Sequence, residues 1–163
     1  MREIGNKFAA GELKIAVVAS RFNHFIVEQL VSGAKDAMKR QGIDKQNQLL
    51  VWVPGAFEIP LVADQLAGSG HYDAVIALGA VVRGGTPHFD FVAGECASGL
   101  GRVALDRGIP VTFGVLTTDT VEQALERAGV GEGNKGFDAA VTAIEMIETL
   151  RTIRVHLKND AQP

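Results

Sequence analysis

Short apolar runs separated by segments of helical period constrain the fold more than any other feature of this sequence. The runs are rich in Val, Ile and Leu, are apolar at nearly every position, and cover residues 13–19, 49–53, 74–82 and 111–116. Strands that are apolar on both sides are typical of a parallel sheet covered by helices on both faces. The sequence therefore predicts a doubly wound, three-layer α/β/α fold with a mainly parallel, four-stranded sheet, in the order β-α-β-α-β-α-β-α-α.

Five segments between and after these runs carry the periodicity or the end signals of helices. The first has apolar residues at helical spacing from Val27 to Met38 and ends at Gln41-Gly42. We expect the others over about 58–68, 89–106, 119–127 and 137–152, with Thr118 or Asp119 capping the fourth. The 163 residues fit a single domain over 1–163, with residues 1–12 as an N-terminal arm and 153–163 as a C-terminal tail.

Composition excludes several classes of protein. With 47% hydrophobic and 21% charged residues, the chain is expected to be globular rather than disordered. A net charge of −3 offers no electrostatic basis for binding nucleic acid or an anionic membrane surface. Cys96 is the single cysteine, which excludes an intrachain disulfide, and the longest apolar run falls short of the roughly 20 residues that span a bilayer. We therefore expect a cytoplasmic protein without membrane or nucleic-acid partners.

A glycine-rich segment follows the third apolar run, at the kind of position where parallel sheets bind their ligands. Gly84, Gly85 and Thr86 precede Pro87, which is typical of a first helical turn. The backbone N–H groups of such a loop, together with the Thr86 hydroxyl and the helix start, can cradle a phosphate. The lysine of a nucleotide-triphosphate loop is missing, because Gly85 stands in its place. A plain glycine-rich turn before a helix is the alternative.

His88 lies within one turn of this loop. An imidazole beside a phosphate ester can donate or accept protons near neutral pH, whereas a lone histidine at a helix start often only caps or packs. The remaining histidines, His24, His71 and His156, have neither the spacing nor the cysteine partners of a metal site. We therefore expect no metal.

Aromatic and polar residues also follow the first two apolar runs. Gly55 and Ala56 permit close approach of the backbone to a ligand, and Glu58, at a helix start, can accept hydrogen bonds from hydroxyl groups. The alternative is that Glu58 only complements the helix dipole and that Phe57 is buried. Phe22 can stack on a planar ligand or belong to the core.

Three further residues have weaker individual signals. Arg127 ends a helix, where an arginine ordinarily complements the dipole, but it would clamp a phosphate if its guanidinium reached the glycine loop. Phe113 and Lys135 are, taken alone, a strand side chain and a loop charge.

Four segments in one chain together resemble the 6,7-dimethyl-8-ribityllumazine synthase family: VPGAFEIPL, ALGAVVRGGTPHFDFV, FGVLTTDTVEQALERAG and GNKG. The resemblance covers residues 13–150, and the segments stand in the order and at the spacings of the family. It implies a flavodoxin-like fold and a transferase that condenses 5-amino-6-(D-ribitylamino)uracil with 3,4-dihydroxy-2-butanone 4-phosphate, the penultimate step of riboflavin biosynthesis. It also implies no metal and no organic cofactor.

The resemblance assigns roles to individual residues. His88 resembles the proton donor, and Phe22 resembles the aromatic that stacks on the pyrimidine. The other substrate positions are Ala56, Phe57 and Glu58 for the ribityl chain, Ala80, Val81, Val82 and Phe113 for the pyrimidine edge, and Gly85, Thr86 and Arg127 for the phosphate. Asn23 and Lys135 are further candidates, Lys135 at the rim of the site.

The resemblance also implies an assembly. Family members form pentamers with sites between adjacent subunits, some build shells of 60 subunits, and association with riboflavin synthase is a further expectation. Phe113 and the Lys135 loop would then come from the neighbour of the subunit that provides Phe22 and His88. Two other functions stay open: a non-catalytic flavin- or lumazine-binding shell protein and a plain structural scaffold. Intact His88 and Arg127 favour the enzyme, since neither alternative requires them.

Overall fold

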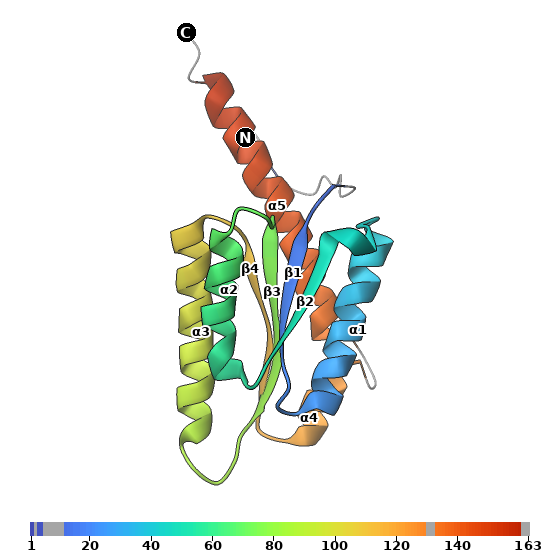
Figure 1. The fold of residues 1–163 in the computed structure, drawn as a ribbon, viewed down its shortest axis with the longest axis vertical. Coiled ribbons are helices and arrows are strands. Elements are labelled where there is room, and N and C mark those ends of the chain that lie inside the picture. Colours follow the sequence, from blue (N-terminus) through green and yellow to red (C-terminus); the bar gives the residue numbers. More distant parts are fainter. Residues whose placement is uncertain (2, 5–11, 130–132, 161–163) are drawn as a thin grey trace.

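A parallel sheet forms the centre of the molecule. The computed structural model describes residues 1, 3–4, 12–129 and 133–160. The strand order is β2-β1-β3-β4, with β1 (Ile15–Ser20), β2 (Gln48–Val53), β3 (Ala74–Val82) and β4 (Val111–Thr118) (Figure 1). All three pairings are parallel, so the carboxyl ends of the strands meet at one edge of the sheet. The predicted four-stranded parallel sheet is confirmed.

Helices cover both faces of this sheet. The helices α2 (Ile59–Gly68) and α3 (His88–Arg107) pack on one face, and α1 (His24–Arg40), α4 (Val121–Arg127) and α5 (Lys135–Asp160) pack on the other (Figure 1). Each face has its own buried cluster, and β1 alternates between them. Ile15 and Val17 join the cluster of α1 and α5, whereas Ala16 and Val18 join the cluster of α2 and α3. This alternation explains why the first run is apolar at every position, and it confirms the three-layer α/β/α fold.

Several helix ends follow the signals in the sequence. The α3 helix stops at Gly108, whose φ of 67° lies in the left-handed region that glycine adopts without strain. The α2 helix follows Glu58 and carries Pro60 in its first turn, where a missing N–H breaks no intrahelical bond.

The predicted cap of the fourth helix is wrong. The hydroxyl of Thr120, rather than a side chain at Thr118 or Asp119, accepts the hydrogen bond from the Gln123 backbone N–H at 3.2 Å. The reason is that β4 stays paired with β3 through Thr118, opposite Val82, so the chain is still extended there.

The last helix is longer than the sequence pattern indicated. It begins at Lys135 and continues to Asp160, so residues 153–160 of the predicted C-terminal tail are helical, while 161–163 and most of the arm over 1–12 lie outside the described residues. Neither Gly nor Pro interrupts residues 152–160, and His156 contacts Asp160 at 3.3 Å with the i,i+4 spacing that supports a last turn. The end of the apolar pattern near residue 152 therefore does not mark the end of this helix.

The start of α5 is fixed to α1. A Cβ at Gly136 would overlap the backbone of Leu30, so only glycine permits the two helices to approach this closely. The Asn134 side chain, just before α5, donates to the backbone oxygens of Gln29 and Ala128 at 2.9 Å each, and accepts at 2.9 and 3.0 Å from the N–H groups of Gly136 and Phe137. These bonds cap α5 and position Lys135.

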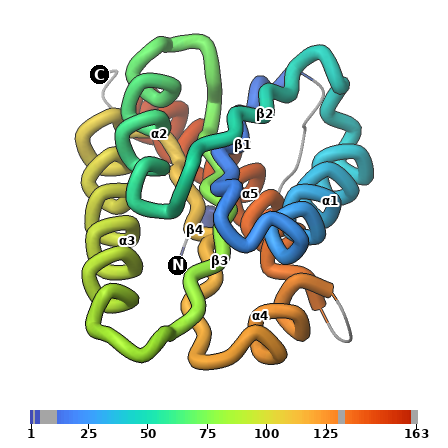
Figure 2. The backbone as a smooth tube through the Cα atoms, turned by 60° about the horizontal axis from the view of Figure 1, so that its bottom comes forward, coloured from blue at the N-terminus to red at the C-terminus, as the bar shows by residue number. Residues whose placement is uncertain are grey.

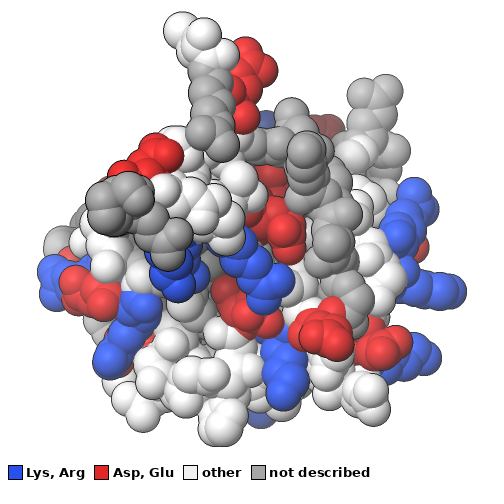
Figure 3. All heavy atoms as spheres, turned by 90° about the horizontal axis from the view of Figure 1, so that it is seen from above, with Lys and Arg blue, Asp and Glu red and all other residues white. Residues whose placement is uncertain are grey.

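The described surface carries both signs of charge. Lys and Arg side chains alternate with Asp and Glu over the face seen from the top of Figure 1 (Figure 3). None of the described helices combines the length and the hydropathy needed to cross a bilayer.

Candidate active site

A cavity of about 560 Å³, here called the edge cavity, lies at the carboxyl edge of the sheet. Figure 2 brings this edge forward and shows the connections that follow the strands. The lining comes from the connections after β1, β2 and β3 and from the first turns of α3: Phe22, Gly55, Ala56, Phe57, Glu58, Ala80, Val81, Val82, Gly84, Thr86, His88, Phe89, Phe91 and Val92. Eleven of these fourteen residues were singled out in the sequence, and the exceptions are Phe89, Phe91 and Val92.

Phe22 presents its ring to the edge cavity. The residue is 69% exposed, and its backbone N–H donates to the Pro54 oxygen at 3.1 Å, which ties the β1 connection to the end of β2. The alternative of a core phenylalanine is therefore excluded. Asn23 does not line the cavity. It has a left-handed φ of 57° and donates through Nδ2 to the Ala80 oxygen at 2.8 Å, so it holds the start of α1 against β3.

The connection after β2 contributes a carboxylate and a second ring. Ala56–Glu58 form a 3₁₀ turn in which Ala56 is buried, whereas Phe57 is 56% exposed, so the alternative of a buried Phe57 is wrong. The Glu58 carboxylate lies over Gly55, because a Cβ at Gly55 would stand 2.9 Å from Oε2 of Glu58. A glycine at this position therefore leaves the carboxylate room beside the cavity.

The glycine loop reaches the edge cavity through Gly84 and Thr86, while Gly85 is exposed and does not line it. No side chain caps the first turn of α3, and the residue before that helix is Pro87. Uncapped N–H groups at a helix start are suited to an anion, so the loop keeps the geometry of a phosphate cradle.

The first turns of α3 present one face to the cavity. His88, Phe91 and Val92 stand at i, i+3 and i+4 and all line it, with His88 exposed. Sequence reasoning missed Phe91 and Val92, although their helical spacing from His88 could have revealed them. The same reasoning missed Phe89, which also lines the cavity.

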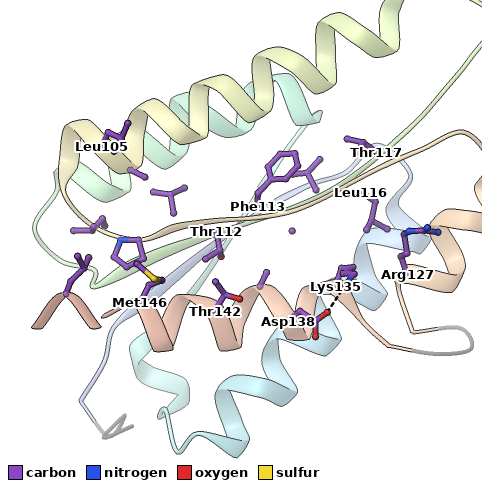
Figure 4. A pocket seen from close by; sticks show the side chains of 18 of the residues that line it. Leu105, Thr112, Phe113, Leu116, Thr117, Arg127, Lys135, Asp138, Thr142 and Met146 are labelled. Atoms are coloured by element: carbon purple, nitrogen blue, oxygen red, sulfur yellow. Dashed lines mark hydrogen bonds and ion pairs between the residues drawn. The ribbon is translucent and has the colours of Figure 1, made fainter. Parts of the chain in front are cut away.

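A second cavity, of about 800 Å³ and here called the β4 cavity, lies between β4, the end of α3 and α5. Figure 4 shows Phe113 from β4, Arg127 from α4 and Lys135 from α5 among its lining. The Lys135 Nζ lies 3.1 Å from the Asp138 carboxylate. The Arg127 guanidinium donates a hydrogen bond to the backbone oxygen of Gln123 at 3.0 Å. Apart from Asn23 and Gly85, which line neither, the predicted site residues are thus divided between two cavities of one chain.

One chain does not bring Arg127 to the glycine loop. Arg127 lines the β4 cavity, while Gly84 and Thr86 line the edge cavity. Phe113, which is 45% exposed, also lines the β4 cavity and not the edge cavity that Phe22 lines. The clamp expected from the sequence is therefore not formed within a single chain.

Comparison with known proteins places this chain in a family. Residues 12–151 match the family model of 6,7-dimethyl-8-ribityllumazine synthase. The 6,7-dimethyl-8-ribityllumazine synthase of Edwardsiella ictaluri (strain 93-146) is 57% identical over 155 residues, which cover 94% of this chain and 99% of the relative. The chain belongs to the 6,7-dimethyl-8-ribityllumazine synthase family. The matched residues, 12–151, include every residue that lines the two cavities.

Membership of the lumazine synthase family implies small-molecule substrates and an oligomeric assembly. An oligomer suits the exposed rings on the two cavities, since large apolar side chains grouped on a surface mark binding or subunit contacts. Within the described residues, no group of three or more His, Cys, Asp and Glu side chains is placed to hold a metal ion.

Proposed function

We propose that this chain forms the lumazine at a site built from the edge cavity of one copy and the β4 cavity of a neighbouring copy. The activity is that of the family: condensation of 5-amino-6-(D-ribitylamino)uracil with 3,4-dihydroxy-2-butanone 4-phosphate, with release of phosphate and water, in riboflavin biosynthesis. One observation carries the proposal. Phe22, Glu58 and His88 line the first cavity, and Phe113, Arg127 and Lys135 line the second.

The ribitylaminouracil binds in the edge cavity. The exposed ring of Phe22 stacks on the flat pyrimidine, and the backbone at Ala80–Val82 reads its edge. Glu58 accepts hydrogen bonds from the ribityl hydroxyls beside Ala56 and Phe57. Phe113 of the neighbouring copy closes the site over the pyrimidine.

The phosphate of the second substrate binds between the two copies. The uncapped start of α3, with Gly85 and Thr86, offers N–H and hydroxyl groups from one side. Arg127 of the neighbour supplies the positive charge, and Lys135 lies at the rim. A cation held beside a departing phosphate stabilises the charge that develops as the bond breaks.

His88 carries the proton transfers. The substrate amine attacks the ketone to give an imine, phosphate then leaves, the chain tautomerises, and a second amine closes the ring. Each step moves a proton at a nitrogen, oxygen or carbon of the bound substrates, and an imidazole can donate and accept protons near neutral pH. Holding two substrates in register supplies much of the remaining acceleration.

The assembly that completes the site is a homopentamer. The same proposal includes further assembly into a 60-subunit shell and association with riboflavin synthase. A cytoplasmic location also belongs to it, because a single buried cysteine needs no oxidising compartment.

The test is to mix the purified protein with both substrates and to follow the absorbance of the lumazine together with phosphate release. Growth of both signals in step, well above the uncatalysed rate, is the expected result. A flat trace from folded, oligomeric protein that still binds the ribityl pyrimidine would contradict the proposal and support the non-catalytic carrier.

A further inference from the structure

Arg83 joins three parts of the chain beside the edge cavity. Its Nε lies 2.9 Å from an Asp119 carboxylate oxygen and its Nη1 lies 3.4 Å from the Asp90 carboxylate. Its guanidinium carbon stands 4.3 Å from the centre of the Phe89 ring, within the range of a cation–π contact. Two of these partners, Phe89 and Asp90, are the residues that directly follow His88 in α3.

Arg83 is itself firmly held. Its backbone N–H donates to the Thr118 oxygen at 2.8 Å, which continues the pairing between β3 and β4. Its main partner is also held, because the Asp119 backbone N–H donates to the Gln123 side chain at 2.9 Å. The guanidinium is therefore anchored to the start of α4 and reaches from there to the first turn of α3.

The loop between Arg83 and His88 has few contacts of its own. A Cβ at Gly84 or Gly85 would meet nothing within 4 Å, so the space on the side-chain side of both glycines is open. The first turn of α3 also lacks a side-chain cap. The contacts of Arg83 with Phe89 and Asp90 therefore link this turn to the end of the sheet through side chains.

We propose that Arg83 is a positioning residue that fixes the first turn of α3 so that His88 faces the substrates. The inference rests on the proposed function, because it assigns Arg83 to the proton-transfer half of that site. Although Arg83 is the cation nearest to the glycine loop in the sequence, its guanidinium is committed to two carboxylates and a ring. Arg83 is therefore not the phosphate ligand, and Arg127 is the residue that binds the phosphate.

The two roles differ in the kinetic constant that they control. Loss of a phosphate ligand weakens binding and raises KM for the butanone phosphate, whereas a misplaced proton donor lowers kcat. We expect Arg83→Met to lower kcat about fivefold with KM for both substrates within about twofold, because a small displacement of a catalytic group is enough to slow the reaction.

A double-mutant cycle with His88→Ala distinguishes positioning from a general structural effect. In the His88→Ala background, Arg83→Met should lower kcat by less than about 1.5-fold, since the group that it positions is already gone. An equal loss of kcat in both backgrounds would overturn the proposal, and so would an unchanged kcat in the single Arg83→Met variant. A His88→Ala variant with the wild-type rate would overturn it as well.

Arg107→Met is the matched control. Arg107 also lies at the surface, at the other end of α3, and pairs with Asp64 at 2.8 Å. A hydrogen bond to a carboxylate raises the pKa of both arginines, from Asp119 for Arg83 and from Asp64 for Arg107. Exposed ion pairs of this kind contribute little to stability, so both variants should fold, and only Arg83→Met should lose kcat.

A second variant keeps the test decisive if Arg83→Met does not assemble. Asp119→Ala removes the carboxylate that anchors the Arg83 guanidinium, leaves Arg83 in place, and should give the same non-additive loss with His88→Ala. Additive losses there would refute the positioning role. Absence of lumazine formation by the wild-type protein would instead reject the proposed function, so the two failures are distinguishable.

Discussion

The substitution Gly136→Ala tests the close contact on which the start of α5 depends. The added methyl would overlap the backbone of Leu30 in α1, and a backbone cannot rotate out of the way as a side chain can. The two helices must then move apart, although Asn134 ties the start of α5 to the backbone of α1 and Gly136 is itself buried.

The magnitude follows from two opposing effects. Overpacking ordinarily costs about 1–3 kcal/mol, and the upper end applies here because the obstacle is backbone. Removing a glycine from a helix returns at most about 1 kcal/mol of conformational entropy. We therefore expect a net loss of about 2 kcal/mol in the free energy of unfolding, or a Tm lower by about 4–8 °C for a chain of this length.

The assay is thermal unfolding followed by circular dichroism, with lumazine formation measured in parallel. Gly101→Ala is the matched control, because it adds the same methyl to α3 where no described atom outside the helix's own backbone lies within 4 Å. The control should keep the wild-type Tm or exceed it. If Gly136→Ala proved as stable as Gly101→Ala, the argument that α1 and α5 require a glycine at their contact would be refuted.

Three further predictions concern the site and the buried thiol. His88→Ala should lower kcat by about 10- to 100-fold without abolishing turnover, because substrate positioning survives the loss of the proton donor; complete inactivity in a folded, assembled variant would contradict this. Arg127→Ala should raise KM for the butanone phosphate by about tenfold or more, as expected for loss of a charge-assisted hydrogen bond, and an unchanged KM would remove its assigned role. Burial raises the pKa of Cys96 from 9.0 to about 11, so the native thiol should resist a thiol reagent at mildly alkaline pH and react once the chain is unfolded. Because the unfolded thiol ionises first, stability should fall as the pH rises from about 9 towards 11; rapid labelling of the native protein, or a flat stability profile, would contradict this.

Elements whose signals are local could be predicted from the sequence alone. The four apolar runs became four parallel strands because a strand buried on both faces leaves no polar position, as at Ile15 to Val18. Gly108 ended α3 because the left-handed conformation favours glycine. The edge cavity lies where parallel strands bring their carboxyl ends together, so Phe22, Glu58 and His88 could be predicted from their places after the apolar runs. The residues Ala80–Val82 were assigned through the family resemblance instead.

Features that depend on residues far apart in the chain could be recognised only in the fold. Thr120 rather than Thr118 caps α4 because β4 remains paired with β3, which no local pattern records. Arg83 directly precedes the glycine loop in the sequence, and only folding brings Asp119 and Asp90 to its guanidinium. Arg127 looks like a clamp for the glycine loop, yet within one chain it lines the other cavity. Local propensity acts over a few residues, whereas these pairings depend on where the sheet places the ends of distant segments.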